Sequence, residues 1–432
     1  MRMRARTLAT AGMLVVGCGR GAPPTTGPIS PPTPTPTVTA TPGPRLDARP
    51  ILCEGARPGD DTVVELTCSD VRHSRMLRPR TGPLAVALAG GALLVVGGDA
   101  SRDHASAGDA DAPGAGTAEL YDPALGRWLE VPAPAGLVAA DGWASRLIAT
   151  DEGPTWLGAA IVDDRVRITL ARFDVDHRTW SAPEAVPLTP PAGRHVAHVV
   201  AAQLTDGALL VVTVDRATLR EHGRWRALPP LPPTDDVVTW VAPLPDGGAL
   251  VGGRFVLARG ATPSWRDLGA AAPERVIRGT YAPVVIGDGR IAIAGGCSDG
   301  GECWGDSELD VFDPTSGRYL TSPPVLGREH SAGPVAVALG ADRLLLTSDF
   351  GDGRELEHCT VPADPTAALA CRCGACDVPA RDAFAMVRAD RDCALILGGT
   401  IDGEATTDVL RFCWSDRPWP AAADAASADD AP

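Results

Sequence analysis

The sequence predicts an all-β fold assembled from a repeated unit, and three observations predict it. An aromatic pair seven residues apart recurs: Tyr121 and Trp128, Phe173 and Trp180, Phe312 and Tyr319, Phe412 and Trp419. Hydrophobic runs that close in a glycine pair recur as well, as in ALLVVGG, RIAIAGG and CALILGG. No segment carries a sustained 3.6-residue period between helix caps. A unit of about fifty residues with a hydrophobic run, a glycine pair and an aromatic strand is typical of a propeller blade.

Seven hydrophobic stretches are expected to form the inner strands of these units. They begin at Leu84, near Leu147, and at His198, Trp240, Ala282, Pro334 and Ala383. Several are two short apolar runs joined by a tight turn, such as Thr205-Asp206-Gly207, which is how a β-hairpin is encoded. The sequence therefore predicts a β-propeller of seven blades, with six or eight as alternatives because the middle units are poorly marked.

The segment 61–77 has no inner strands of its own and is interpreted as an orphan outer strand. A ring of blades has to be closed, and an N-terminal strand that completes the last blade closes it while covering a sheet edge. The aromatic residues of the repeat are interpreted as packing between neighbouring blades rather than as a binding site.

These features resemble the kelch-repeat and galactose-oxidase central-domain family of propellers. The resemblance rests on the glycine pairs beginning at positions 97, 252, 295 and 398, the turns Tyr121-Asp122-Pro123 and Phe312-Asp313-Pro314, and Arg328-Glu329-His330. The units ending at Trp180 and Trp225 depart from the family pattern because they lack the glycine pair. The resemblance implies four-stranded blades whose glycines end the second strand, where a residue without Cβ permits close packing.

The N-terminus predicts export and lipid attachment. Arg2, Arg4 and Arg6 precede a short apolar stretch, which is the order of a secretory signal and too short for a spanning helix. Val-Val-Gly-Cys ending at Cys18 resembles the bacterial lipobox, which implies acylation of that thiol and cleavage before it. Gly19 then favours outer-membrane delivery under the sorting rule of that family. The alternative is an ordinary signal peptide with an incidental cysteine.

Four segments are expected: a lipoprotein signal peptide at 1–17, the lipidated cysteine and a Pro/Thr-rich spacer at 18–50, the propeller at 51–421, and an acidic disordered tail at 422–432. A lipid followed by a spacer holds a folded domain away from a membrane. The net charge of −15 argues against nucleic acid as a partner. We expect a monomer in the cell envelope, attached to the membrane through its lipid only.

Ten further cysteines, an even number in an exported chain, predict up to five disulfides. Cys297 and Cys303 flank a short loop and are expected to bond to each other. A disulfide between Cys393 and Cys413 would cross-link the last blade. A disulfide between Cys53 and Cys68 would hold the N-terminal segment together. As an alternative, either pair of cysteines could instead bond across to tie the two chain ends together.

The remaining cysteines, Cys359, Cys371, Cys373 and Cys376, allow three interpretations. Four thiolates suit a tetrahedral zinc ion, and the Cys-x-x-Cys spacing of Cys373 and Cys376 suits redox chemistry. Two local disulfides are favoured because the chain is exported and the motif does not begin a helix.

Catalytic and metal-binding patterns are weak. Copper oxidases in the resembling family use tyrosines, but two of the three tyrosines here are assigned to packing. No G-x-S-x-G, phosphate-binding loop or H-E-x-x-H occurs in the sequence. His195 and His198 are expected to face opposite sides of a strand. The Asp-rich loop 99–114 is favoured as solvated, with calcium binding as the alternative.

We therefore expect an envelope propeller that acts as a binding or scaffold module for an envelope protein or a surface polysaccharide, with no catalytic residue, cofactor or metal. Loops on a rigid scaffold carry binding, and the long insertions after Gly98 and Gly296 are the expected binding face. The alternatives are a carbohydrate-active lyase or hydrolase on the same scaffold, and a structural spacer. Fold alone does not separate these classes.

Overall fold

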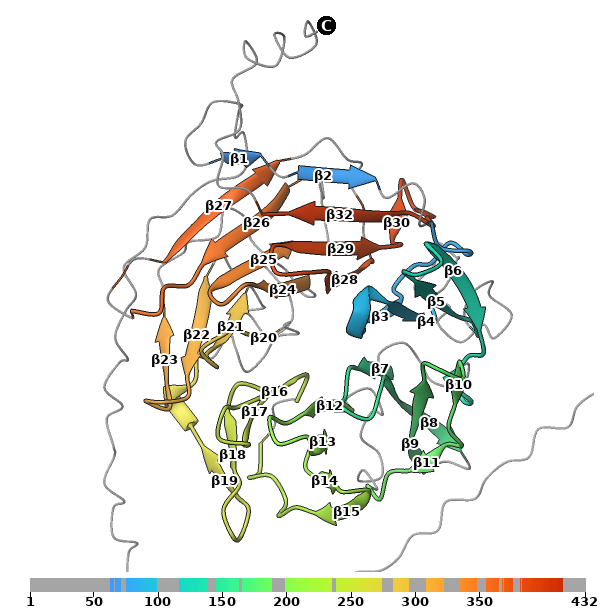
Figure 1. The fold of residues 1–432 in the computed structure, drawn as a ribbon. Helices are drawn as coiled ribbons and strands as arrows, with labels where there is room; N and C mark the ends of the chain where they lie inside the picture. Colours follow the sequence, from blue (N-terminus) through green and yellow to red (C-terminus); the bar gives the residue numbers. More distant parts are fainter. Residues whose placement is uncertain are drawn as a thin grey trace, which may run out of the picture. The chain divides into compact units, whose positions relative to one another are not determined.

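Seven β-sheets are arranged as blades around a ring (Figure 1). The structure is a computed structural model that describes residues 63–65, 67–70, 75–98, 116–137, 145–162, 165–188, 199–234, 238–273, 283–294, 308–321, 335–347, 355–364, 367, 369–375, 381 and 383–414. Within this part of the chain the fold is all-β, with two short 3-10 helices, η2 (Ala89–Gly91) and η6 (Gly269–Ala271). The predicted fold class is confirmed.

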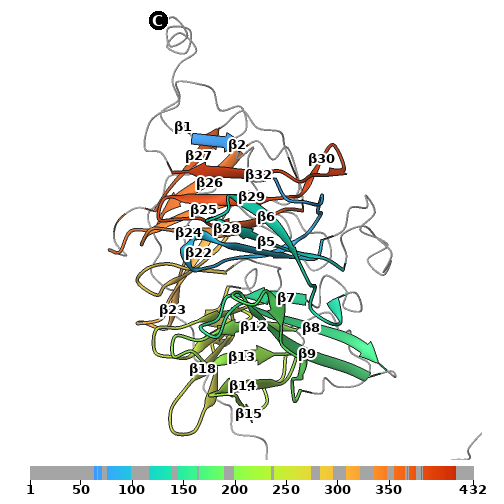
Figure 2. The same ribbon diagram turned by 45° about the vertical axis from the view of Figure 1, so that its right-hand side comes forward.

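From Leu84 onward, the main strands of each blade are antiparallel neighbours and follow chain order from the innermost strand outward; the N-terminal strands described below are the exceptions. Blade 1 consists of β3 (Leu84–Ala87), β4 (Leu93–Val96), β5 (Ala118–Asp122) and β6 (Arg127–Val131). Blade 2 consists of β7 (Ser145–Ile148), β8 (Thr155–Val162), β9 (Arg165–Asp174) and β10 (Thr179–Trp180), with the added strand β11 (Glu184–Ala185). Blade 3 consists of β12 (Val200–Gln203), β13 (Leu209–Val212), β14 (Ala217–Glu221) and β15 (Arg224–Ala227). Figure 2 shows blades 2 and 3 beside each other.

The remaining blades follow the same plan. Blade 4 consists of β16 (Val241–Pro243), β17 (Ala249–Val251), β18 (Phe255–Ala258) and β19 (Ser264–Asp267). Blade 5 consists of β20 (Pro283–Val285), β21 (Ile291–Ala294), β22 (Leu309–Asp313) and β23 (Arg318–Thr321). Blade 6 consists of β24 (Val335–Leu339), β25 (Arg343–Thr347), β26 (Glu355–Thr360) and β27 (Ala370–Ala375). Blade 7 consists of β28 (Ala385–Arg388), β29 (Cys393–Leu397) and β32 (Val409–Cys413), with the hairpin β30 (Thr400–Ile401) and β31 (Glu404–Ala405) inserted.

The ring closes through strand contacts at both radii. Each innermost strand lies beside the innermost strand of the next blade, and β28 lies beside β3. On the outside, β2 (Thr67–Asp70) pairs antiparallel with β32, so the predicted closure by an N-terminal outer strand is confirmed. A feature that the sequence did not indicate is β1 (Val63–Glu65), which pairs parallel with β27 of blade 6. One short N-terminal segment therefore borders two neighbouring blades.

The core consists of seven hydrophobic clusters, each between two neighbouring blades. In β4, Leu94 and Val96 belong to the cluster shared with blade 2, whereas Leu93 and Val95 belong to the cluster shared with blade 7. Side chains alternate along a strand, so a strand buried on both faces must be apolar at every position. This explains why the second strand of most units is an unbroken hydrophobic run.

The predicted aromatic pairs are confirmed in three blades, where the ring centroids lie 5.1 to 5.4 Å apart. The second aromatic of a blade also bonds to the preceding blade. Trp180 Nε1 donates to the Pro132 carbonyl at 2.7 Å, and Trp265 Nε1 donates to the Pro229 carbonyl at 2.8 Å. The Tyr319 hydroxyl donates to the Gly253 carbonyl at 2.6 Å. The interpretation of these residues as clamps between blades is therefore confirmed.

The fourth predicted pair, Phe412 with Trp419, stays a prediction, because Trp419 lies outside the described residues. The two strands beside β32 are β29 and β2, and Cys68 of β2 occupies the register position opposite Phe412. The fourth strand of blade 7 therefore comes from the N-terminal end of the chain. Trp414 contacts blade 6, with its ring centroid 4.0 Å from that of the His358 ring and 4.9 Å from the Arg343 guanidinium.

The glycine pairs that the structure describes, beginning at 97, 252 and 398, follow the second strands, as the family resemblance implies, and their backbone explains why glycine is needed. Gly97 and Gly98 follow β4 with φ of 68° and 87°, in the left-handed region that favours glycine. A Cβ on Gly98 would lie 3.1 Å from the Cβ of Arg80. On Gly398 it would lie 2.7 Å from the Arg80 carbonyl oxygen. The glycines thus make room for the segment that enters blade 1.

Candidate functional site

The two faces of the ring carry different kinds of connection. Successive strands of a blade alternate in direction, so the turn between the first and second strands and the hairpin between the third and fourth lie on one face. We call this the AB face. The links between second and third strands lie on the opposite face, the BC face. The expected binding insertions after Gly98 and Gly296 belong to the BC face, and their residues lie outside the described part of the chain.

Aspartates occupy the first turns of the AB face and cap their own backbone. Asp206 Oδ1 accepts a hydrogen bond from the Ala208 amide at 3.1 Å, and Asp246 Oδ1 accepts one from the Gly248 amide at 2.9 Å. Asp288 caps the corresponding turn of blade 5 in the same way. Aspartate favours such turns because its side chain imitates a backbone acceptor. Part of the acidic surplus is therefore structural, and each capping carboxylate keeps a second oxygen for other contacts.

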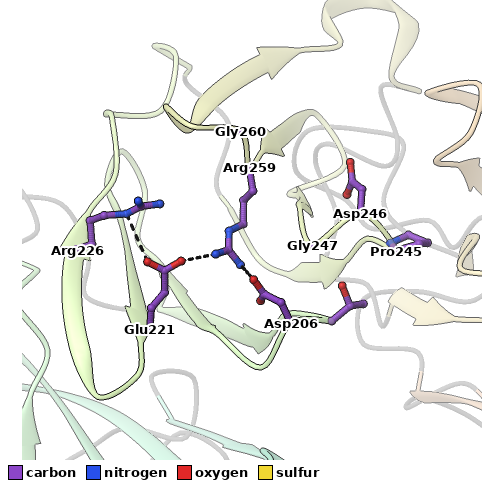
Figure 3. Close-up of a pocket in the computed structure, with 9 residues that line it drawn as sticks. Asp206, Glu221, Arg226, Pro245, Asp246, Gly247, Arg259 and Gly260 are labelled. Carbon is purple, nitrogen blue, oxygen red and sulfur yellow. Dashed lines mark hydrogen bonds and ion pairs between the residues drawn. The ribbon is translucent and has the colours of Figure 1, made fainter.

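A polar hollow of about 610 Å³ lies between blades 3 and 4 on the AB face (Figure 3). It is formed by the two first turns, 205–206 and 245–247, by Glu221 and Arg226 of the blade 3 hairpin, and by Arg259 and Gly260 after β18. We call it the 3–4 hollow. It is open to solvent, and its lining is mostly polar.

The Arg259 guanidinium lies between two carboxylates and bridges the blades. It forms ion pairs with Asp206 and with Glu221, and Glu221 also lies 3.7 Å from Arg226 Nε (Figure 3). Among the described residues, the terminal nitrogens of Arg226 and the Oδ2 of Asp246 have no hydrogen-bond partner. The hollow therefore offers the terminal nitrogens of one guanidinium and one carboxylate oxygen for further hydrogen bonds.

The corresponding groove between blades 2 and 3 is filled by its own side chains. Arg172 and Arg220 both contact Glu152 and Glu184, at distances of 2.5 to 3.4 Å. Trp225 Nε1 also donates to Glu184 Oε1 at 2.5 Å. The space that remains is only about 30 Å³. The extra strand β11 supplies Glu184, and blade 3 has no equivalent strand in the described residues, so the next groove stays open.

A different ion pair holds the BC side of the seam between blades 7 and 1. Arg80 and Glu119 are 2.8 Å apart, and both side chains are 0% exposed. Glu119 also accepts the backbone amides of Leu77 and Arg78, at 2.6 and 3.2 Å. Burial lowers the pKa of Arg80, and Glu119 opposes that shift. Sequence reasoning missed this pair because its members lie 39 residues apart.

Two disulfides join cysteines that face each other across neighbouring strands. Cys393 bonds to Cys413 within blade 7, as predicted, and Cys359 bonds to Cys371 within blade 6. The second bond uses two of the four thiolates of the proposed zinc site, so the four-cysteine site is not formed. Cys373 of β27 and Cys68 of β2 are placed only by their backbone register. The second of the two local disulfides stays a prediction, since Cys376 lies outside the described residues.

Several predicted features lie outside the described residues. They are Cys18, Cys53, Cys297, Cys303, Cys376, His195, His198, Arg328-Glu329-His330, the Asp-rich loop 99–114, the signal peptide and spacer, and the acidic tail. Their roles and the domain boundaries stay predictions. In the described ranges, no group of three or more His, Cys, Asp or Glu residues is placed to hold a metal ion. No described helix is long and apolar enough to cross a membrane.

Comparisons with known proteins support the fold. No protein-family model matches the chain, and no curated protein matches it. A solved structure of virginiamycin B lyase from Staphylococcus aureus is similar, with 10% identity and a TM-score of 0.51, covering 81% of this chain and all of the lyase. A fungal alcohol oxidase with copper is similar at 13% identity and a TM-score of 0.53, covering 80% of this chain and 75% of the oxidase. At such identities the likeness establishes the β-propeller fold alone.

Proposed function

We propose that this chain is a lipid-anchored, kelch-like propeller of the cell envelope that binds an envelope protein or a surface polysaccharide through its AB face. The observation that carries the proposal is the 3–4 hollow, where the terminal nitrogens of Arg226 and the second carboxylate oxygen of Asp246 are available for further hydrogen bonds. Polar groups placed at fixed positions on a rigid scaffold are what orients a ligand. The envelope location rests on the sequence around Cys18 and on the spacer that follows it.

Binding is favoured over glycoside hydrolysis by the arrangement of the carboxylates. Hydrolysis needs two carboxyl groups that face each other across a space occupied by the sugar. Between Asp206 and Glu221 that space is occupied by the Arg259 guanidinium. A general acid also needs a raised pKa, and the described carboxyls with a shifted pKa, Asp174, Asp267, Asp313 and Asp390, are all lowered.

The binding test uses the full chain, held in detergent and immobilised, with surface polysaccharide and solubilised envelope proteins of the source cells as separate analytes. The double variant Arg226→Ala with Asp246→Ala, once immobilised, is expected no longer to retain one of these two analytes that the wild-type chain retains. Arg216→Ala is the matched control, because Arg216 is exposed, pairs weakly with Asp215 at 3.9 Å and lies on the BC face. Equal retention by the double variant and the wild-type chain would reject the 3–4 hollow as the site. Shortening of the polysaccharide during incubation would favour the lyase or hydrolase alternative.

The anchor is tested separately by feeding cells a fatty acid that carries an alkyne and detecting label on the chain. Label that disappears in Cys18→Ala is the expected result. Label retained in Cys18→Ala, or absent from the wild-type chain, would contradict the lipoprotein prediction while leaving the binding surface untouched.

A further inference from the structure

A second pocket on the AB face lies in the groove between blades 7 and 1, away from the 3–4 hollow. Its volume is about 250 Å³. Blade 1 contributes Leu93, Tyr121 and Trp128, and blade 7 contributes Leu395 and Val409 together with the charged pair Asp390 and Arg411. We call it the 7–1 pocket. It differs from the other two pockets because aromatic residues contribute to its lining.

The aromatic part of the pocket is built by the clamp residues of blade 1. The Tyr121 and Trp128 rings lie 5.4 Å apart and are tilted by 50°. In blade 5 the fourth-strand position that Trp128 holds in blade 1 is held by Tyr319, whose hydroxyl bonds to the neighbouring blade. The Tyr121 hydroxyl, in contrast, has no hydrogen-bond partner among the described residues, and the residue is half-buried. Its polar end is therefore available to a ligand.

The charged part of the pocket is fixed by the first turn of blade 7. Asp390 Oδ1 accepts the amides of Asp392 and Cys393, both at 2.9 Å, and Oδ2 lies 2.5 Å from Arg411 Nη2. Both charged side chains are 45% exposed. Partial burial raises the pKa of Asp390, but the Asp392 amide and Arg411 outweigh it and the net pKa is lowered. The carboxylate thus stays an acceptor in mildly acidic solution, next to a guanidinium that only donates.

We propose that the 7–1 pocket binds a single neutral pyranose ring, free or at the end of a saccharide. A pyranose has an apolar C–H face that suits the half-buried Tyr121 ring, which the buried Trp128 ring contacts and holds in place. Its hydroxyl groups both donate and accept, so they satisfy Asp390, Arg411 and the Tyr121 hydroxyl together. An aliphatic side chain would satisfy none of these groups, and a charged ligand would meet a like charge on one of them. The volume of the 7–1 pocket, about 250 Å³, is smaller than that of pockets for drug-sized ligands, so the pocket suits a single sugar ring.

The experiment is saturation-transfer NMR on the full chain in a detergent without sugar headgroups. The probes are methyl glucopyranoside, methyl galactopyranoside and methyl N-acetylglucosaminide at millimolar concentration. The expected result is transfer from the protein to the C–H protons of one ring face for at least one probe. Ala389→Trp, which fills the pocket, should abolish this transfer. Arg411→Met should weaken binding about tenfold, the loss expected for a hydrogen bond to a charged group.

Controls separate the pocket from general effects. Arg411 is on the surface, so Arg411→Met keeps the proposal testable if Ala389→Trp fails to fold. Tyr121→Phe should weaken binding and keep the ring-face contact, and Arg216→Ala on the BC face should leave the transfer unchanged. No transfer to any pyranoside, transfer that persists in folded Ala389→Trp, or preferential binding of N-acetylphenylalaninamide would each overturn the proposal. The proposed function at the 3–4 hollow would survive that failure, since it uses different residues.

Discussion

The seam between blades 7 and 1 and the 3–4 hollow use the same chemical groups in different surroundings. At the seam, Arg80 and Glu119 are fully buried, and Glu119 accepts from two backbone amides in addition. In the hollow, Arg259 is 14% exposed, and its partner Asp206 is 45% exposed. Water therefore reaches one set of charges and not the other. Burial, rather than residue type, therefore separates a structural ion pair from one at the proposed binding surface.

The energetic difference between the two regions follows from desolvation. An exposed ion pair contributes about 0–1 kcal/mol, because water and salt screen it. Removing one partner of a buried pair costs about 3–5 kcal/mol, because the other charge stays buried without compensation. The seam should thus be sensitive to single substitutions, while the AB face should tolerate them and show its function in binding.

The largest effect is expected for Arg80→Met. The substitution leaves Glu119 charged at a site with 0% exposure, so we expect a loss of about 3–5 kcal/mol in the free energy of unfolding. Denaturant unfolding followed by tryptophan fluorescence measures it. The matched control is Arg226→Met, whose side chain is 45% exposed and which should change stability by less than about 0.5 kcal/mol.

Two results would bear on this prediction in opposite ways. Partial recovery in the double variant Arg80→Met with Glu119→Gln would support the buried charge as the cause of the loss. A loss below about 1 kcal/mol in Arg80→Met would instead mean that water reaches Glu119, and the distinction between the two regions would fail.

The blades could be predicted from sequence, whereas the grooves between them could not. Each hydrophobic stretch encodes two neighbouring strands, so local pattern is sufficient to place, for example, β3 and β4. The fourth strand of blade 7 comes from residues 67–70, and its pairing had to be inferred from the need to close the ring, since pairing between chain ends has no local signal. The 3–4 hollow depends on turns that are 40 residues apart, such as those of Asp206 and Asp246, meeting in space. Their shared Asp-Gly turn pattern was visible in the sequence, but their proximity was not.

An intermediate effect is expected for Arg259→Ala. It removes both ion pairs that bridge blades 3 and 4, and because these are partly exposed we expect a loss of about 1 kcal/mol or less. Thermal unfolding in low salt and in about 1 M salt tests the origin of this effect, since screening should shrink it. The loss in Arg80→Met should stay constant over the same range. A loss of stability in Arg259→Ala that does not depend on salt would mean that the Arg259 ion pairs are shielded from water like the buried Arg80–Glu119 pair. It would contradict the difference in burial between the two regions.

The smallest effect belongs to the most exposed pair, His177 and Asp174, in the outer hairpin of blade 2. His177 Nδ1 lies 2.8 Å from Asp174 Oδ2, and the side chains are 79% and 50% exposed. The hydrogen bond to the Asp174 side chain raises the pKa of His177 above its ordinary value of 6.5, and the bonds from the His177 backbone and ring lower the pKa of Asp174. The His177 contribution to stability is complete below its unfolded pKa and is lost as pH rises through its raised pKa.

At the acid end, the Asp174 contribution is lost as pH falls through its lowered pKa, so the pair acts only between these two limits. An NMR titration of the His177 ring should give a midpoint above 6.5 that returns toward 6.5 in Asp174→Asn or at high salt. A midpoint that Asp174→Asn leaves unchanged would mean that the hairpin does not hold the two side chains together. Because both groups face water, this shift should appear in the titration with little change in the stability of the ring, which completes the gradient from buried to exposed charges.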